Sequence, residues 1–139
     1  MLNLRVIFIP CLLCLSACTL LSPKAEYIPD NGVLKDAIVG MPYFSKISIV
    51  RGRVFGGVER KAGIIEPNDS GIFLRNCLLP SWMITENTRD TKDHNCVEVY
   101  GTPTKPGIIN INISSGMYGH MFAPASEFSK DYTLTVVNP

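Results

Sequence analysis

Strict alternation of isoleucine and asparagine at residues 109–113, which read ININ-I, constrains the fold of this chain more than any other feature. Successive side chains of a β-strand point to opposite faces, so this segment places its isoleucines on one face and its asparagines on the other. Residues 132–136 repeat the same period as YTLTV. Both segments are therefore expected to be half-buried antiparallel strands, with one face on a core and the other in solvent.

In all, seven short segments are rich in β-branched or aromatic residues, the two above included. Gly, Pro, Asn and Asp punctuate almost every gap between them, which predicts short strands joined by turns. They span residues 43–50, 63–66, 71–77, 82–85, 96–100, 107–114 and 132–137. Ten prolines and eleven glycines argue against a long helical bundle. The sequence therefore predicts an all-β fold, a β-sandwich of about seven short antiparallel strands that forms one domain over residues 33–139.

Residues 1–17 have the pattern of an export signal. Residues 1–5 carry one positive charge, residues 6–15 form an apolar run interrupted only by Pro10, and two small residues follow. The apolar run is about half of the ~20 residues that a membrane-spanning helix needs, which makes a short membrane helix the weaker alternative.

Residues 15–18, LSAC, resemble the lipobox of bacterial lipoproteins. The resemblance implies that Cys18 becomes the new N-terminus and carries fatty acids such as palmitate on its sulfur and its amine. Thr19, where an aspartate would favour the inner membrane, implies sorting to the outer membrane. Residues 18–32, with two prolines and no apolar period, are then expected to form a lipidated tether. A plain secretory signal cleaved near Ala17 is the alternative.

Cys77 and Cys96 are the side-chain thiols that remain once residues 1–17 are removed and Cys18 is lipidated. Two thiols of an exported domain usually pair, so the sequence predicts a disulfide that closes a loop of about 20 residues. A zinc site would need His94 beside both cysteines and a fourth ligand, and the spacing of zinc motifs is absent.

The run ENTRDTKDHN at residues 86–95 contains no aliphatic residue and lies between the cysteines, so it is expected to be a solvated loop tied at its base. Glu86, Asp90 and Asp93 could hold a calcium ion, but the run lacks the glycine turn and the terminal glutamate of a calcium loop. No metal and no cofactor is predicted.

Four further segments resemble motifs of the immunoglobulin-like, cadherin-like domains found in bacterial surface and secreted proteins. They are AIVGMPY at 37–43, LPSWMI at 79–84, VYGTPTKPG at 99–107 and DYTLTV at 131–136. Their order and rough spacing agree with that family over residues 37–137. The resemblance implies an immunoglobulin-like sandwich, whereas the basic segment 52–61 and the paired cysteines depart from the family pattern.

Two segments are candidates for partner binding. The first holds four cations, which are expected to form a patch for an acidic partner or, alternatively, a solvated edge of a hairpin. They are Arg51, Arg53, Arg60 and Lys61.

The second candidate is the connection GMYGHMF at residues 116–122, whose large side chains are typical interface anchors. They are Met117, Tyr118, His120, Met121 and Phe122. The alternative is that these side chains fold back and plug the core. Trp82 is expected in the core rather than in a ligand platform.

No catalytic motif is found, so the sequence predicts that the protein is not an enzyme. Removal of residues 1–17 leaves 12 basic and 12 acidic side chains, an even balance that does not favour nucleic acid. The predicted function is that of a non-enzymatic, membrane-anchored lipoprotein of the bacterial cell envelope that faces the periplasm and acts as a protein-binding or accessory module. The alternatives are an immunity lipoprotein that neutralises a toxin delivered to the periplasm, and an accessory lipoprotein of a secretion or surface apparatus.

Overall fold

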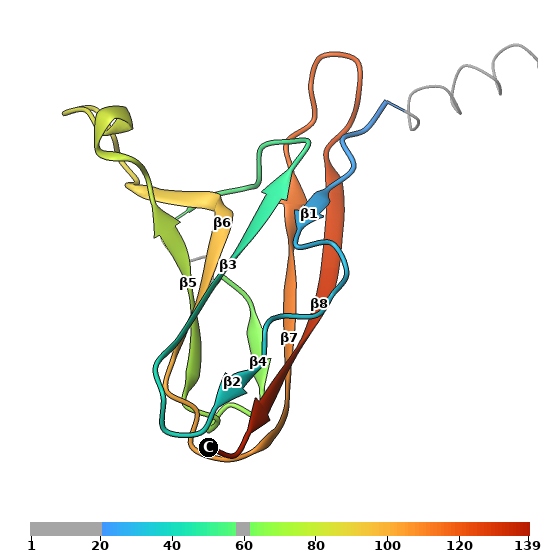
Figure 1. The fold of residues 1–139 in the computed structure, drawn as a ribbon. Helices are drawn as coiled ribbons and strands as arrows, with labels where there is room; N and C mark the ends of the chain where they lie inside the picture. Colours follow the sequence, from blue (N-terminus) through green and yellow to red (C-terminus); the bar gives the residue numbers. More distant parts are fainter. Residues whose placement is uncertain (1–20, 58–61) are drawn as a thin grey trace, which may run out of the picture.

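The computed structural model describes residues 21–57 and 62–139, which form a β-sandwich of two four-stranded sheets (Figure 1). The first sheet has the order β1 (Glu26–Ile28), β3 (Tyr43–Val50), β6 (Lys92–Gly101) and β5 (Ile72–Leu78). The second has the order β2 (Ala37–Ile38), β8 (Ser126–Val137), β7 (Gly107–Met117) and β4 (Ile64–Glu66). The predicted all-β sandwich is confirmed, with eight strands in the described residues where about seven were expected.

The β7–β8 hairpin is the longest pairing and follows the predicted alternation. Its register runs from Gly107 opposite Val136 to Met117 opposite Ser126. Ile109, Ile111 and Ile113 are buried, as are Tyr132, Leu134 and Val136 on the paired strand. Asn112 lies on the outer face, where its side-chain amide donates hydrogen bonds to Ser129 Oγ (2.9 Å) and Asp131 Oδ1 (2.7 Å).

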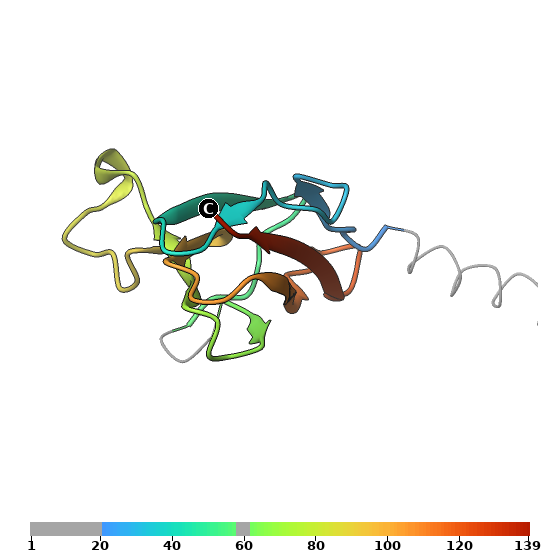
Figure 2. The same cartoon turned by 60° about the horizontal axis from the view of Figure 1, so that its bottom comes forward.

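The core fills the space between the two sheets, whose layers are visible in Figure 2. The first sheet contributes fully buried aliphatic side chains at alternate positions of β3 and β6, because the same period of two holds there. They are Ile47, Ile49, Val97 and Val99. With the inward face of the β7–β8 hairpin they make one continuous apolar cluster.

The predicted disulfide between Cys77 and Cys96 is present, with a Cα–Cα distance of 5.4 Å. It joins the adjacent strands β5 and β6 of one sheet, at the point where the β5–β6 register shifts after Asn76. The bridge therefore ties the base of the connection at residues 79–91. It also excludes the zinc alternative, because both sulfurs are consumed in the bond.

Two elements differ from the sequence prediction. The strand predicted at residues 82–85 is wrong: Ser81–Met83 form the single-turn 3-10 helix η1 instead. This segment projects beyond the end of β5 and has no neighbouring strand with which to pair (Figure 1). The tether predicted at residues 18–32 is also wrong in part, because β1 pairs with Ser48–Val50 of β3. A strand of three residues is too short to show a period.

The segment around β1 is held to the body by hydrogen bonds from β8. Ser126 Oγ donates to the carbonyl of Pro23, Lys130 Nζ to that of Asp30 (2.6 Å), and Tyr132 Oη to that of Pro29 (2.6 Å). The folded domain therefore begins well before residue 33, the predicted boundary.

Tyr132 predicts a specific loss of stability at high pH. Its side chain is 1% exposed, and burial, followed by the neighbouring Tyr27 and Asp30, raises the pKa of Tyr132 from 10.0 to about 12. In the unfolded chain this phenol loses its proton near pH 10, so the unfolded state is favoured above that pH. The stabilisation is complete below pH 10 and is lost as the pH rises toward 12, by at most about 1.4 kcal/mol per pH unit.

Urea unfolding of the wild type and of Tyr132→Phe over this pH range is the measurement. The variant is expected to be less stable at neutral pH but to lose stability less steeply above pH 10, because the titrating group is gone. Equal slopes for the two proteins would show that Tyr132 does not carry the effect.

The predicted export signal and Cys18 lie outside the described residues, as do Arg60 and Lys61. Within residues 21–57 and 62–139, no helix is long and apolar enough to cross a membrane.

Candidate functional site

Three connections that the sequence singled out meet at one end of the sandwich, which we call the loop end. They are residues 51–57 after β3, residues 79–91 between β5 and β6, and residues 118–125 between β7 and β8. β3 and β7 both run toward this end and β6 and β8 start from it, so antiparallel pairing brings the connections together (Figure 1). Segments that are far apart in the sequence therefore share one surface.

The connections enclose a groove of about 620 Å³ at the loop end. Its lining is mixed: cationic, aromatic and apolar side chains come from different segments. The main contributors are Arg53, Met83, Arg89, Lys92 and Tyr118. Arg53, Arg89 and Lys92 are all exposed, so the groove offers basic side chains to solvent beside apolar surface.

Arg53 and Tyr118, which the sequence proposed separately, lie together in the groove. The backbone N–H of Tyr118 donates to the carbonyl of Arg53 (2.9 Å), and that of Phe55 donates to the carbonyl of Gly116 (2.8 Å). The guanidinium of Arg53 lies 5.7 Å from the centre of the Tyr118 ring, and the Phe55 ring packs edge-on against the same ring at 4.5 Å. Tyr118 is thereby held in place as one wall of the groove.

Arg51 and Met117, in contrast, do not contribute to the groove. Arg51 has a positive φ of 75° and its Nε donates to Glu26 Oε2 at 3.0 Å, so its charge is paired on the outer surface. Met117 is 0% exposed and belongs to the core. The prediction that Met117 binds a partner is therefore corrected: Met117 ends β7 on the same odd-numbered positions as Ile109, Ile111 and Ile113, whose side chains face the core.

Asn95 shapes the groove and was not singled out from the sequence. Its Nδ2 donates to the carbonyls of Ile49 (2.6 Å) and Gly52 (2.7 Å), while its Oδ1 accepts from the backbone N–H of Val54 (3.0 Å). One side chain thus fixes the whole turn that follows β3. Its partners lie more than 40 residues away in the chain, so no local pattern indicates them.

The acidic side chains of the groove are engaged in local contacts. Asp90 accepts from the backbone N–H of Lys92 (3.0 Å) and from His94 Nε2 (2.8 Å), and these two hydrogen bonds hold the pKa of Asp90 below its usual value. Asp93 Oδ1 accepts from the backbone N–H of Asn95 (3.0 Å). The groove therefore carries three exposed cations, Arg53, Arg89 and Lys92, against two carboxylates that are oriented by hydrogen bonds within the domain.

His94 has hydrogen-bond partners at both ring nitrogens. Its Nε2 faces Asp90, and its Nδ1 lies 3.1 Å from Nδ2 of Asn76. With Nε2 donating to the carboxylate, Nδ1 accepts from the amide, which is the neutral tautomer. The partners of the ring are Asp90 and Asn76, so His94 holds the side chain of Asp90 in place within the groove.

The structure does not bring the carboxylates of Glu86, Asp90 and Asp93, the alternative calcium site, together as a group of three. No group of three or more His, Cys, Asp or Glu side chains in the part of the chain that the structure describes could hold a metal ion.

Large apolar side chains are exposed on two of the connections at the loop end. Trp82 is 80% exposed on the β5–β6 connection, so the prediction that it lies in the core is wrong. That connection leaves the sandwich, and no second layer covers it (Figure 1). On the β7–β8 connection Met121 is 89% and Phe122 70% exposed, and His120 is exposed beside them. These side chains extend outward rather than plugging the core.

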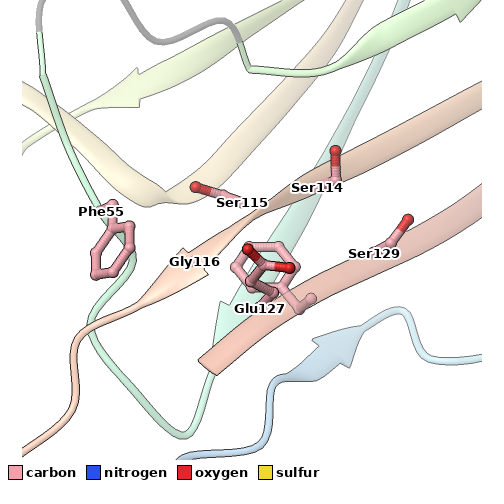
Figure 3. A pocket seen from close by; sticks show the side chains of 7 residues that line it. Phe55, Ser114, Ser115, Gly116, Glu127 and Ser129 are labelled. Atoms are coloured by element: carbon pink, nitrogen blue, oxygen red, sulfur yellow. The ribbon is translucent and has the colours of Figure 1, made fainter. Parts of the chain in front are cut away.

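A second hollow, of about 580 Å³, lies beside the groove along the β7–β8 hairpin. Figure 3 shows Ser114 and Ser115 on β7, Glu127 and Ser129 on β8, and Phe55 across from them. The described residues that line it are mostly polar, with three serines and Glu127 beside two phenylalanine rings.

Comparison of the chain with protein-family models, with curated proteins and with solved structures found no match.

Proposed function

We propose that this protein is a lipid-anchored, non-enzymatic lipoprotein of the bacterial envelope, held in the outer membrane through Cys18, that binds another envelope protein at its loop end. The lipobox resemblance supports the anchor. The immunoglobulin-like relationship implied by the four sequence motifs is part of the same proposal. The all-β sandwich supplies a rigid body from which the loops project.

The observation that carries the binding proposal is the groove itself. It presents three exposed cations, and the connection that lines it with Met83 also carries the exposed Trp82 at the preceding position; tryptophan and arginine are among the residue types most enriched at interface hot spots. Arg53 is already stacked near Tyr118, so little side-chain freedom is lost when a ligand binds there.

The charges of the groove indicate the chemistry of the partner. The three exposed cations of the groove, Arg53, Arg89 and Lys92, outnumber its two carboxylates, Asp90 and Asp93, whose oxygens accept hydrogen bonds within the domain. An acidic segment of a protein, with an apolar residue that packs on Trp82, fits this combination. An immunity or accessory role would use the same groove and differ only in the partner.

Reversal of the groove charges is expected to weaken partner binding by about 10-fold or more, because surface charge pairs contribute about 0.2–1 kcal/mol each and reversal adds repulsion. The test is photocrosslinking in cells from a benzoylphenylalanine placed at position 82 of the full-length protein. The variant Arg53→Glu, Arg89→Glu, Lys92→Glu is expected to lose the crosslinked product.

The matched control reverses the same number of charges away from the groove, in Lys35→Glu, Lys46→Glu, Lys105→Glu, and is expected to keep the product. A second control places the crosslinker at Phe44, which is exposed at the other end of β3. Equal crosslinking by both triple variants, or crosslinks that arise equally from positions 44 and 82, would contradict the proposal. Thermal melting of each variant verifies that it is folded.

A further inference from the structure

The tip of the β7–β8 connection is separate from the groove and has its own chemistry. Residues 118–125 contain no Asp, Glu, Lys or Arg. At the tip Met121 is 89% exposed and Phe122 70%, and neither lines the groove. Two adjacent large apolar side chains, both exposed at the end of a long hairpin, are costly to leave in water.

Three backbone N–H groups of this tip, those of His120, Phe122 and Ala123, donate hydrogen bonds within the tip itself. The N–H of His120 donates to the carbonyl of Ala123 (2.9 Å), and the N–H of Ala123 donates back to the carbonyl of His120 (3.0 Å). The N–H of Phe122 donates to Nδ1 of His120 (3.3 Å). A turn whose N–H groups are internally bonded can leave water at a smaller cost than an open loop.

The tip also lies at the end where the chain enters the domain. Ser126, the first residue of β8, donates from its hydroxyl to the carbonyl of Pro23, and Glu26 of β1 pairs with Val50 at the same end. Figure 1 shows the start of the described chain beside the β7–β8 connection. The polypeptide that leads back toward Cys18 therefore leaves from the base of this hairpin.

The distance between the proposed lipid and the hairpin is limited by covalent geometry. Pro23 lies five positions after Cys18, and a fully extended chain spans at most about 3.6 Å per position, so the two residues are at most about 18 Å apart. A lipid at Cys18 would thus hold the hairpin close to the membrane surface.

We infer that the tip of the β7–β8 connection, with Met121 and Phe122, inserts into the interface of the phospholipid layer that holds the lipid of Cys18. This inference rests on the proposed lipid anchor. The occupant is lipid rather than a protein partner, because the tip contains no Asp, Glu, Lys or Arg, bonds three of its N–H groups internally and lies beside a short tether. Apolar and aromatic side chains buried in the headgroup region add to the anchoring by acyl chains.

The insertion orients the domain. An acyl anchor alone lets the domain rotate about its tether. A second contact at the hairpin tip holds the sandwich upright, with its long axis pointing away from the membrane surface. The loop end then faces the bilayer, and the turn between β6 and β7 points away from it.

The experiment uses full-length protein from bacterial membranes, reconstituted into vesicles of phosphatidylethanolamine and phosphatidylglycerol. Trp82, the single tryptophan of the chain, is replaced in Trp82→Phe, and a new tryptophan is placed at the tip by Phe122→Trp. We expect blue-shifted emission and strong quenching when part of the lipid carries bromine on its acyl chains. Met121→Trp in the same background is a second reporter, in case the first variant is poorly folded.

The matched control is Phe44→Trp in the Trp82→Phe background, since Phe44 is 57% exposed toward the far end of β3. Its emission is expected to be unchanged by brominated lipid. Flotation with the vesicles and the mass of the N-terminal peptide report the anchor separately.

An acylated protein that floats with the vesicles while tryptophans at positions 121 and 122 are not quenched would overturn this inference but not the anchor. Quenching that is equal at positions 44 and 122 would overturn it as well. Crosslinking of the tip to an envelope protein, with no quenching by lipid, would assign it to a protein partner instead. A protein without acyl chains at Cys18 would overturn both the anchor and the inference.

Discussion

Replacement of both Cys77 and Cys96 by serine is expected to lower the free energy of unfolding by about 3 kcal/mol, the chain-entropy value for a loop closed by residues 19 positions apart. The free energy of unfolding of a domain of this kind is about 5–15 kcal/mol in total, so this loss is a large share of it. The melting temperature is expected to fall by roughly 10–20 °C. The connection at residues 79–91 should also loosen, because the bridge lies at its base, and crosslinking from position 82 should weaken with it.

Chemical denaturation of the oxidised wild type and of the double variant measures this difference. The wild type in reducing agent serves as the control: it should fall to the stability of the variant, whereas the variant should not respond to the reducing agent. A change of less than about 0.5 kcal/mol, the range of an ordinary surface substitution, would show that the bridge does not stabilise the domain.

The second large effect is expected at Asn95. Asn95→Ala removes the hydrogen-bond partners of two carbonyls and one N–H group in the turn after β3. At about 1 kcal/mol for each lost hydrogen bond, the free energy of unfolding should fall by about 3 kcal/mol. The turn should also become accessible to trypsin at Arg51 and Arg53. Partner crosslinking should decrease, because Arg53 is no longer held beside Tyr118.

Asn112→Ala is the matched control, since it makes the same substitution on the exposed face of the β7–β8 hairpin. Its amide also makes two hydrogen bonds, but to side chains that water can replace. We expect a loss below about 1 kcal/mol and unchanged cleavage by trypsin. Similar losses for the two variants would mean that Asn95 does not organise the turn.

The strands that could be predicted best are those in which apolar and polar residues alternate within one continuous segment. The alternation at residues 109–113 and 132–136 places Ile111 and Leu134 in the core, and both are buried. The disulfide could be predicted as well, because Cys77 and Cys96 are the two thiols that remain once the three N-terminal cysteines are assigned to the signal and the lipid. These features depend on neighbours in sequence or on simple counting.

The features that escaped prediction depend on contacts between distant segments. Asn95 is one polar residue in a polar run, and its importance comes from carbonyls on another strand. The sequence predicts Trp82 in the core, yet the core extends only as far as the two sheets face each other, and the β5–β6 connection that carries Trp82 lies beyond them. Likewise, no local pattern indicates that Arg53 and Tyr118 share one groove while Arg51 pairs with Glu26.

The hydrogen bond from Ser126 to Pro23 places the entry of the chain, the hairpin tip and the groove on one side of the molecule. With Cys18 lipidated as proposed, the groove lies within a thin layer above the bilayer. A partner that is itself confined to that membrane meets it by a search in two dimensions, whereas a large protein dissolved in the periplasm must reach into a narrow gap. With the proposed anchor and tip insertion, the architecture would select partners by where they reside as well as by their charge.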